Sequence, residues 1–147
     1  MWLDAVDLQE FYASPLGLTA RRIISTHVRE VWPDVKGMNV LGIGFPTPYL
    51  NAFRNEAACV MAAMPASQGV IHWPTDSANQ TCLTLESELP FPDLSIDRVL
   101  MVHAVECAET IRPMMREIWR VLSGSGRLLV ITPNRRGIWA RLERTPF

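Results

Sequence analysis

Hydrophobic residues at the start of the chain recur with the period of an α-helix. They fall on one side of residues 7–14, and again on one stripe that runs up to Trp32. Ser14 and Pro15 suit the N-cap and first turn of the second helix, and the proline after Trp32 ends it because a residue before proline avoids helical torsions. We therefore predict two helices, which form an N-terminal lead-in over residues 1–36.

Beyond the lead-in, short apolar runs with the length of buried strands alternate with helical patterns. The expected strands are residues 38–43, 59–64, 81–86, 97–102 and 127–132. The expected helices between them are residues 47–57 and 111–122. Strands that alternate with helices pair in parallel through right-handed crossovers. The pattern predicts an α/β fold over residues 37–147, a doubly wound, mostly parallel sheet with helices on both faces that forms one compact unit with the lead-in.

Three segments have less regular patterns. Residues 70–73 fit either a brief strand or a packed loop. Residues 123–126, Ser-Gly-Ser-Gly, are expected to stop the preceding helix with a glycine in a left-handed cap. A basic tail over residues 135–144 is expected to be a last helix. Its arginines and Trp139 fit either a contact with an anion or nucleic acid, or a solvated helix whose apolar side packs inward.

The composition narrows the class of protein. A chain of 147 residues with 48% hydrophobic and 20% charged residues is long enough for one domain with a buried core. The net charge of −1 gives no general attraction for nucleic acid or an anionic membrane. Three cysteines, without metal-ligand spacing to the histidines, indicate reduced thiols and no metal site. Because no signal sequence or bilayer-spanning run is visible, we expect a cytoplasmic protein that does not act at membranes.

The first expected strand runs into a turn that contains Gly42 and Gly44. In open α/β sheets this junction holds nucleotide-like ligands. Glycine lets the backbone approach a ligand, whereas Pro46 and Pro48 remove N–H donors from the same turn. A lone Gly-x-Gly is weak evidence for such a site, so longer motifs must support it.

Two longer segments carry a resemblance to a known family. Residues 89–99, Leu-Pro-Phe-Pro-Asp-Leu-Ser-Ile-Asp-Arg-Val, resemble the stretch before strand four of class I S-adenosylmethionine-dependent methyltransferases, in the broad type 11 group. Residues 116–122, 124, 126–129 and 132–135 resemble the helix and the fifth strand that follow in that family. The resemblance covers residues 37–136. It implies a Rossmann-like methyltransferase fold, S-adenosylmethionine as cofactor, and a small molecule or a protein as methyl acceptor.

The resemblance also shows where this chain departs from the family's cofactor loop. The family ends its first strand with an acidic residue followed by Gly-x-Gly-x-Gly. Matching the flanking residues places Gly42 at the acidic position, and the three glycine positions fall on Gly44, Pro46 and Pro48. A second register reads Gly42 and Gly44 as the glycine pair.

The ends of the second and third strands depart in a similar way. The position of the family's ribose-binding acid is Met64, which cannot accept hydrogen bonds as a carboxylate does. The position that reads adenine falls near Leu85, with Glu86 and Glu88 beside it. The candidate cofactor-binding residues are Gly42, Gly44, Phe45, Met64, Leu85 and Glu86.

The candidate catalytic residues follow the fourth strand, whose tip faces the acceptor in this family. His103 is either a general base that orients the acceptor or a hydrogen-bonded structural histidine. Glu106 is either an acid of the site or the start of the next helix. Methyl transfer often needs only the alignment of the acceptor with the methyl group, so activity does not depend on a base.

Two functional hypotheses follow. The first is an S-adenosylmethionine-dependent methyltransferase-like protein, and the second is a non-catalytic binding or scaffold module that kept the fold but lost cofactor binding. Pro46, Pro48 and Met64 favour the second hypothesis. The family's C-terminal antiparallel strand pair is expected to be missing from these 147 residues. Either the chain is a fragment of a longer protein, or a protein partner or a second copy covers the sheet edge.

Overall fold

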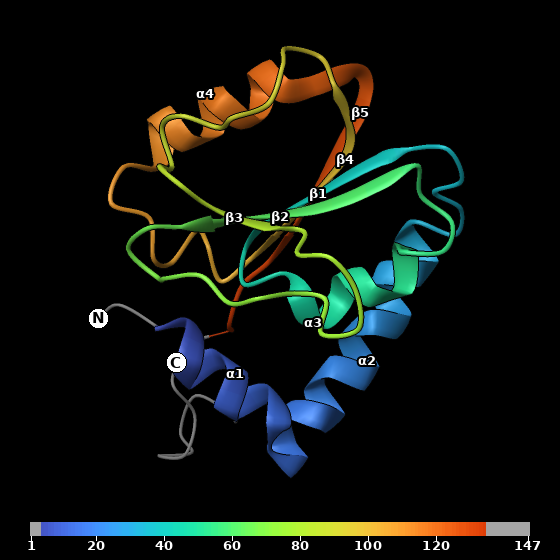
Figure 1. Cartoon of the computed structure of the whole chain (residues 1–147), viewed down its shortest axis with the longest axis vertical. Coiled ribbons are helices and arrows are strands. Elements are labelled where there is room, and N and C mark those ends of the chain that lie inside the picture. The colour runs from blue at the N-terminus through green and yellow to red at the C-terminus, as the bar shows by residue number, and fades with distance from the viewer. Residues whose placement is uncertain (1–3, 135–147) are drawn as a thin grey trace.

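The computed structural model describes residues 4–134, which form a five-stranded sheet between two layers of helices (Figure 1). The strands are β1 (Asn39–Gly44), β2 (Cys59–Pro65), β3 (Thr81–Thr84), β4 (Ile96–Val102) and β5 (Leu122–Ile131). The helices are α1 (Ala5–Ala13), α2 (Pro15–Val31), α3 (Thr47–Leu50) and α4 (Ile111–Val121), with a short 3-10 helix η1 (Asn51–Phe53). The sheet order is β3-β2-β1-β4-β5, and all neighbouring strands are parallel. The predicted doubly wound α/β fold is confirmed.

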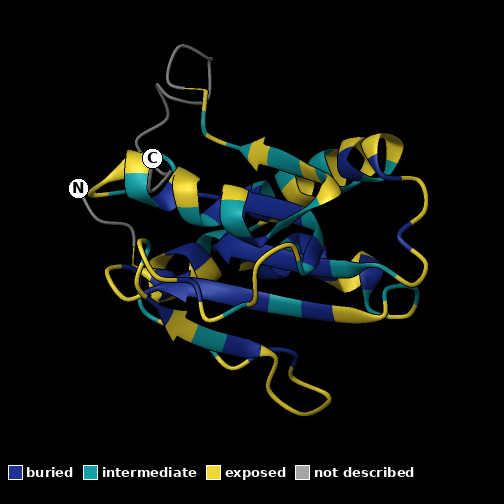
Figure 2. Ribbon diagram, turned by 90° about the horizontal axis from the view of Figure 1, so that it is seen from above, coloured by how far each residue is buried: buried dark blue, intermediate teal, exposed yellow. Residues whose placement is uncertain are grey.

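Each face of the sheet buries its own hydrophobic cluster. α4 covers one face, and α1, α2 and α3 lie on the other (Figure 1). Val40 packs in the cluster that includes Trp32 of the lead-in, whereas Leu41 packs with Ile118 of α4. These consecutive strand residues belong to different clusters because successive side chains of a strand point to opposite faces. Figure 2 shows that β5 is more exposed than the central strands, as its burial pattern also indicates.

The start of α2 follows the predicted capping pattern. The Ser14 hydroxyl accepts a hydrogen bond from the Gly17 N–H at 3.1 Å, and Pro15 is the first helical residue. The same hydroxyl donates to the Phe11 carbonyl at 2.6 Å, so one side chain closes α1 and opens α2. The hinge between the two lead-in helices is therefore set by Ser14.

Two sequence-based expectations about helices are wrong. The helix expected over residues 47–57 ends at Leu50 and continues only as the 3-10 helix η1, because the chain must turn back to reach β2. α4 does not end in a left-handed glycine cap, since Leu122 is extended (φ −66°, ψ 132°) and already pairs with Ile96. Pairing with β4 therefore ends the helix, and the Ser-Gly-Ser-Gly stretch belongs to β5. Residues 70–73, for which two readings were open, form a loop.

An arginine on α4 holds the loop that leads into β4. The Arg120 guanidinium donates to the carbonyl oxygens of Leu89 (2.9 Å) and Phe91 (2.8 Å), and it pairs with Glu117 (2.8 Å). Glu117 also accepts the Leu89 N–H at 2.8 Å. Hydrogen bonds from Arg120 and from the Leu89 backbone lower the pKa of Glu117 from 4.5 to about 2. The segment that resembles the methyltransferase family is thus held in place by the hydrogen bonds of Arg120 and Glu117 to the loop before β4.

We expect Arg120→Ala to destabilise the domain by on the order of 2 kcal/mol at neutral pH, because it removes charged hydrogen bonds. A carboxyl whose pKa is depressed in the folded state stabilises above its unfolded pKa and stops doing so as pH falls to its folded pKa. The difference between wild type and Arg120→Ala should therefore shrink as pH falls from 4.5 toward 2. Urea denaturation at several pH values measures the free energy of unfolding of both proteins. Arg116→Ala, which changes an exposed arginine of α4, is the control. A difference in the free energy of unfolding that does not depend on pH would contradict the role assigned to the Arg120–Glu117 pair.

Among residues 4–134, no helix is long and apolar enough to cross a membrane. The predicted basic tail over residues 135–144 lies outside the described residues.

Candidate active site

The carboxyl ends of β1 and β4 form the position in the sheet at which the strand order reverses. The chain leaves β1 toward β2 and β3 on one side, whereas β4 and β5 lie on the other side. This is the topological switch point, where ligands of open α/β sheets bind. Phe45 follows β1 and His103 follows β4, so these two residues flank the switch point. The Phe45 N–H donates to the Val102 carbonyl at 2.7 Å and thereby extends the ladder between the two strands.

Gly44 is required by the packing of β1 against β4. Its φ is +89°, and a Cβ atom there would lie 2.1 Å from the Val102 carbonyl oxygen and 2.9 Å from the Ala104 Cβ. This glycine therefore serves the close approach of two strand ends. The contact accounts for the glycine whether or not a ligand binds.

The Pro46 ring fills the space that a side chain at position 42 would need. A Cβ atom at Gly42 would lie 2.4 Å from the Pro46 ring and 2.8 Å from a Leu50 methyl group. An acidic side chain at position 42 would not fit beside this proline. The two departures from the family pattern therefore belong together, because the proline fills the place that an acid would need.

The turn after β1 offers few backbone donors. Pro46 and Pro48 have no N–H, and the N–H groups of Tyr49 and Leu50 donate to the Pro46 carbonyl at 3.0 and 3.2 Å. The Phe45 N–H is held by β4. An anionic group of a ligand would find little to bind here.

The turn that follows β2 contains a buried side chain that links several segments. Met64 is fully buried and packs in the core cluster that also contains Phe45. Gln68, four residues on, is buried, and its amide donates to the His103 carbonyl at 2.6 Å. Its backbone carbonyl accepts the Ala5 N–H at 2.8 Å, which attaches the start of α1 to the same turn. Gln68 therefore crosses above the end of β1 and links β2, β4 and the lead-in.

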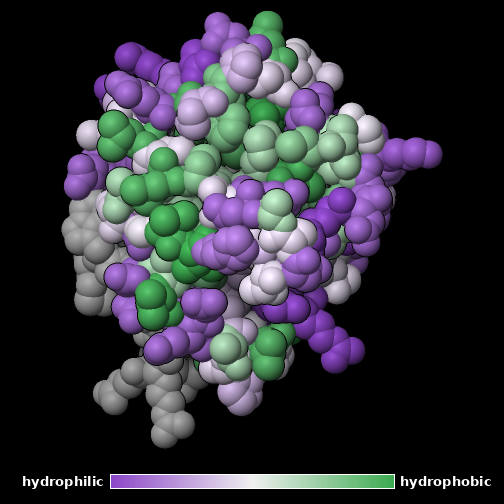
Figure 3. Space-filling model, viewed as in Figure 1, coloured by the Kyte–Doolittle hydropathy of each residue, from purple (hydrophilic) through white to green (hydrophobic). Residues whose placement is uncertain are grey.

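The end of β3 places the two candidate residues in different surroundings. Leu85 is 57% exposed. Figure 3 shows apolar side chains gathered in the left half of that view, where β3 lies in Figure 1. Glu86 is half-buried, and burial raises the pKa of its carboxyl although the backbones of Glu109 and Thr110 donate hydrogen bonds to it. Glu86 thus connects the end of β3 with the loop before α4.

His103 has a strained backbone and partners on both ring nitrogens. Its φ of +53° lies in the left-handed region, which is uncommon outside glycine and recurs at functional sites. The ring is 4% exposed, and its Nδ1 lies 2.8 Å from Oε1 of Glu106. Glu106 lies in a turn five residues before α4, so it does not start the next helix. The carboxylate fixes the proton on Nδ1, which leaves Nε2 as an acceptor.

Two tyrosines complete this cluster, and sequence reasoning missed both. The Tyr12 hydroxyl of α1 lies 2.9 Å from His103 Nε2 and 3.0 Å from the Tyr49 hydroxyl. Burial, then Tyr49 and Glu106, raise the pKa of Tyr12, so its phenol stays protonated and donates to Nε2. Helical spacing placed Tyr12 on the inner side of the lead-in, but only the fold brings it to a residue 91 positions away.

Three buried oxygens at this edge of the sheet have no hydrogen-bond partner among the described residues. They are Gln68 Oε1, Glu86 Oε1 and Glu106 Oε2. They follow β2, β3 and β4, respectively. An unpartnered buried acceptor is unfavourable by about 1–3 kcal/mol, so such atoms need an explanation. A ligand that brings hydroxyl or amino donors would provide one.

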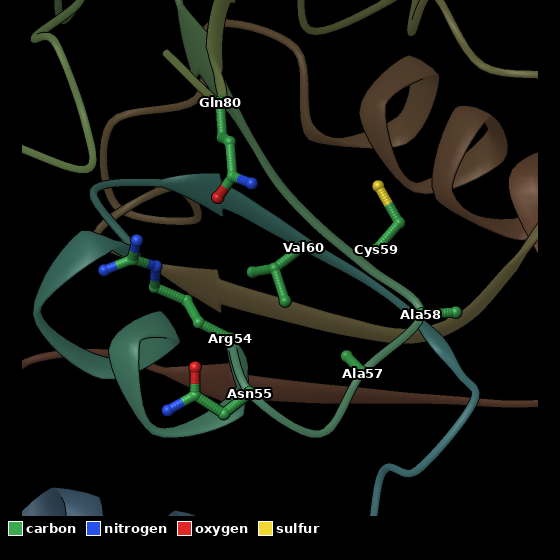
Figure 4. Close-up of a pocket in the computed structure, with 7 residues that line it drawn as sticks. All are labelled: Arg54, Asn55, Ala57, Ala58, Cys59, Val60 and Gln80. Atoms are coloured by element: carbon green, nitrogen blue, oxygen red, sulfur yellow. The ribbon is translucent and has the colours of Figure 1, made fainter. Parts of the chain in front are cut away.

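A separate pocket lies at the opposite edge of the sheet, around the amino end of β2 (Figure 4). Its lining includes Arg54, Cys59 and Gln80. The Arg54 guanidinium pairs with Asp76 at 2.9 Å and lies over the Trp73 ring. Because this pocket is far along β2 from the switch point, it does not belong to the candidate active site.

The fold and its switch point place the chain among the open α/β domains with a parallel sheet, a class in which ligands are usually held above the strand ends. Comparison with known families makes this specific. A model of the methyltransferase domain family matches residues 41–130, which is more than half of the chain. The chain belongs to this family.

Individual relatives agree with the assignment. A probable S-adenosylmethionine-dependent methyltransferase of Mycobacterium tuberculosis is 47% identical over 49 residues, which are 33% of this chain and 18% of that protein. The chain therefore matches less than a fifth of that relative's length.

Solved structures show the same fold at low identity. A candidate S-adenosyl-L-methionine-dependent methyltransferase from Methanococcus maripaludis has a TM-score of 0.65 at 15% identity, over 86% of this chain and 61% of that one. A SAM-dependent methyltransferase from Aquifex aeolicus has a TM-score of 0.63 at 15% identity, over 87% and 72%.

How well S-adenosylmethionine fits this chain depends on the buried oxygen atoms that can accept hydrogen bonds from it. The cofactor carries ribose hydroxyls and amino groups, and the unpartnered oxygens of Gln68 and Glu86 are suited to such donors. Its carboxylate finds few N–H donors in the proline-bearing turn after β1. The acceptor atoms at this edge therefore match the chemistry of the nucleoside part better than that of the carboxylate, and Gln68, unlike Met64, has an oxygen that can accept a hydrogen bond.

Proposed function

We propose that this domain transfers a methyl group from S-adenosylmethionine to an acceptor that presents a hydroxyl group to His103. The observation that carries the proposal is the Glu106–His103 pair, held at 2.8 Å with a left-handed backbone at the end of β4. A carboxylate-paired imidazole beside the switch point of this fold suits a general base.

One group of residues would bind the cofactor, and a second group would act on the methyl acceptor. Bound S-adenosylmethionine supplies an electrophilic methyl group. Gln68 and Glu86 would hold its nucleoside part through the two unpartnered oxygens. His103 Nε2 would accept the hydroxyl proton of the acceptor while Glu106 keeps the other ring nitrogen protonated.

Residues 1–36 and 37–147 would act as one unit, because α1 places Tyr12 against His103. The acceptor would be a small molecule or a protein, and a partner or second copy would cover the sheet edge, where β5 is partly exposed. The free thiols of Cys59, Cys82 and Cys107 support a cytoplasmic location.

Calorimetric titration with S-adenosylhomocysteine tests the cofactor side directly. We expect a dissociation constant below about 100 μM. Glu86→Gln should weaken binding by roughly tenfold because it changes one acceptor of the nucleoside part. Glu88→Gln, which alters an exposed carboxylate two residues away, is the matched control and should bind as wild type.

Absence of heat at millimolar S-adenosylhomocysteine would overturn the proposal and favour a scaffold that kept the fold without the cofactor. Equal affinities of Glu86→Gln and Glu88→Gln would remove Glu86 from the site.

A further inference from the structure

The most informative feature outside the cofactor side is the position of the Tyr12 ring. It stacks on Phe45 with the two ring planes 13° apart and the centroids separated by 5.9 Å. Its hydroxyl reaches both His103 Nε2 and the Tyr49 hydroxyl. Tyr12 therefore sits where the proposed base would meet an acceptor, and its phenol takes the hydrogen bonds that an acceptor hydroxyl would take.

We propose that Phe45, Tyr49 and His103 form the binding site for a phenolic acceptor, and that Tyr12 of α1 fills this site as an intramolecular stand-in. The proposal rests on the proposed function, since it names the class of acceptor for the same base.

The chemistry of the site selects a phenol over other hydroxyl compounds. The flat face of Phe45 provides a stacking surface for an aromatic ring. His103 Nε2 accepts the hydroxyl proton, and the Tyr49 hydroxyl can donate to the phenol oxygen. An anionic acceptor would be repelled by Glu106, and the raised pKa of Tyr12 shows that this environment favours the protonated phenol. A neutral aryl hydroxyl satisfies all these conditions.

Displacement of Tyr12 would require α1 to move away from the sheet. The helix has nine residues, of which Ala5, Leu8 and Tyr12 are buried. Helices this short are marginal in water by themselves, so tertiary contacts keep α1 in place. Segments held by few buried contacts open at lower free energy than the whole domain. A phenol that binds the opened site competes with Tyr12 and shifts the population of α1.

Hydrogen exchange of the full-length wild-type protein tests this competition. The probe is p-cresol, which has the shape of a tyrosine side chain, and toluene is the matched ligand without the hydroxyl. If p-cresol captures the opened state, exchange of the α1 amides should rise about tenfold at ten times its dissociation constant for that state. The amides of α4, on the other face, should not change. Toluene should have no comparable effect, because it leaves His103 and Tyr49 unpaired.

A variant tests the same site without competition. Tyr12→Ala should bind p-cresol at least about tenfold more tightly than wild type, since no side chain has to leave. Gln9→Ala, which changes an exposed side chain of the same helix, should bind as wild type. If Tyr12→Ala does not fold alone, millimolar p-cresol should restore its cooperative thermal unfolding and toluene should not.

Unchanged or slower α1 exchange in saturating p-cresol would overturn the proposal. Equal effects of toluene and p-cresol would also overturn it, since the hydroxyl would then not be recognised. The calorimetric result separates this proposal from the preceding one. Binding of S-adenosylhomocysteine without any p-cresol effect leaves methyl transfer standing and refutes a phenolic acceptor. The reverse result supports the phenol site and refutes the cofactor.

Discussion

Gly44→Ala is expected to destabilise the domain by roughly 3 to 5 kcal/mol. Part of this loss comes from the positive φ of +89°, where an L side chain is unfavourable by about 1–2 kcal/mol. The remainder comes from the Val102 carbonyl oxygen, which would lie 2.1 Å from the new Cβ atom. β1 and β4 would have to move apart at the switch point, where both strands are fully buried.

Gly69→Ala provides the matched control for this prediction. Gly69 has nearly the same φ, +88°, but its nearest neighbour for a Cβ atom is the Ala5 methyl group at 4.0 Å. We expect a loss of only about 1–2 kcal/mol, from backbone strain alone. Urea denaturation of both variants gives the difference, which isolates the strand contact. Similar losses in the two variants would show that Gly44 is needed only for its torsion angle.

The sequence predicted the sheet because each strand is a short, nearly continuous apolar run. Such runs belong to strands that are buried on both faces, and their alternation with helical patterns restricts the topology to parallel crossovers. The expected bounds of β4, residues 97–102, differ from Ile96–Val102 by one position. The helix after β1 was overestimated, since residues 51–57 carry no signal for the turn back to β2.

Local sequence patterns predicted the site residues less well than they predicted the strands. Gly42 and Gly44 were singled out as cofactor residues, but the structure first explains them by packing against Pro46 and Val102. Gln68 lies in a turn without periodicity, and Tyr12 has the pattern of an ordinary inward-facing helix residue. Both enter the site through contacts between segments distant in the sequence, which no local pattern encodes.

The second large effect is expected for Glu106→Gln. Glu106 acts through His103, because its carboxylate holds the Nδ1 proton and keeps Nε2 free to accept another. A glutamine amide can instead donate to Nδ1, which favours the tautomer with the proton on Nε2. That tautomer cannot take a proton from an acceptor. We expect methyl transfer to fall by about 10²–10⁴-fold, the usual contribution of a general base.

The rate is measured with labelled S-adenosylmethionine, using small phenols as the first acceptors. S-adenosylhomocysteine affinity should stay as in wild type, because Glu106 is assigned to the acceptor side. Glu106→Asp keeps the charge and should recover part of the rate, whereas a purely structural role would not distinguish charge from size. Glu109→Gln, an exposed carboxylate in the same loop, should retain full activity. Equal losses in Glu106→Asp and Glu106→Gln would show that the size of the side chain matters and its charge does not, and His103 would then lose its assignment as the base.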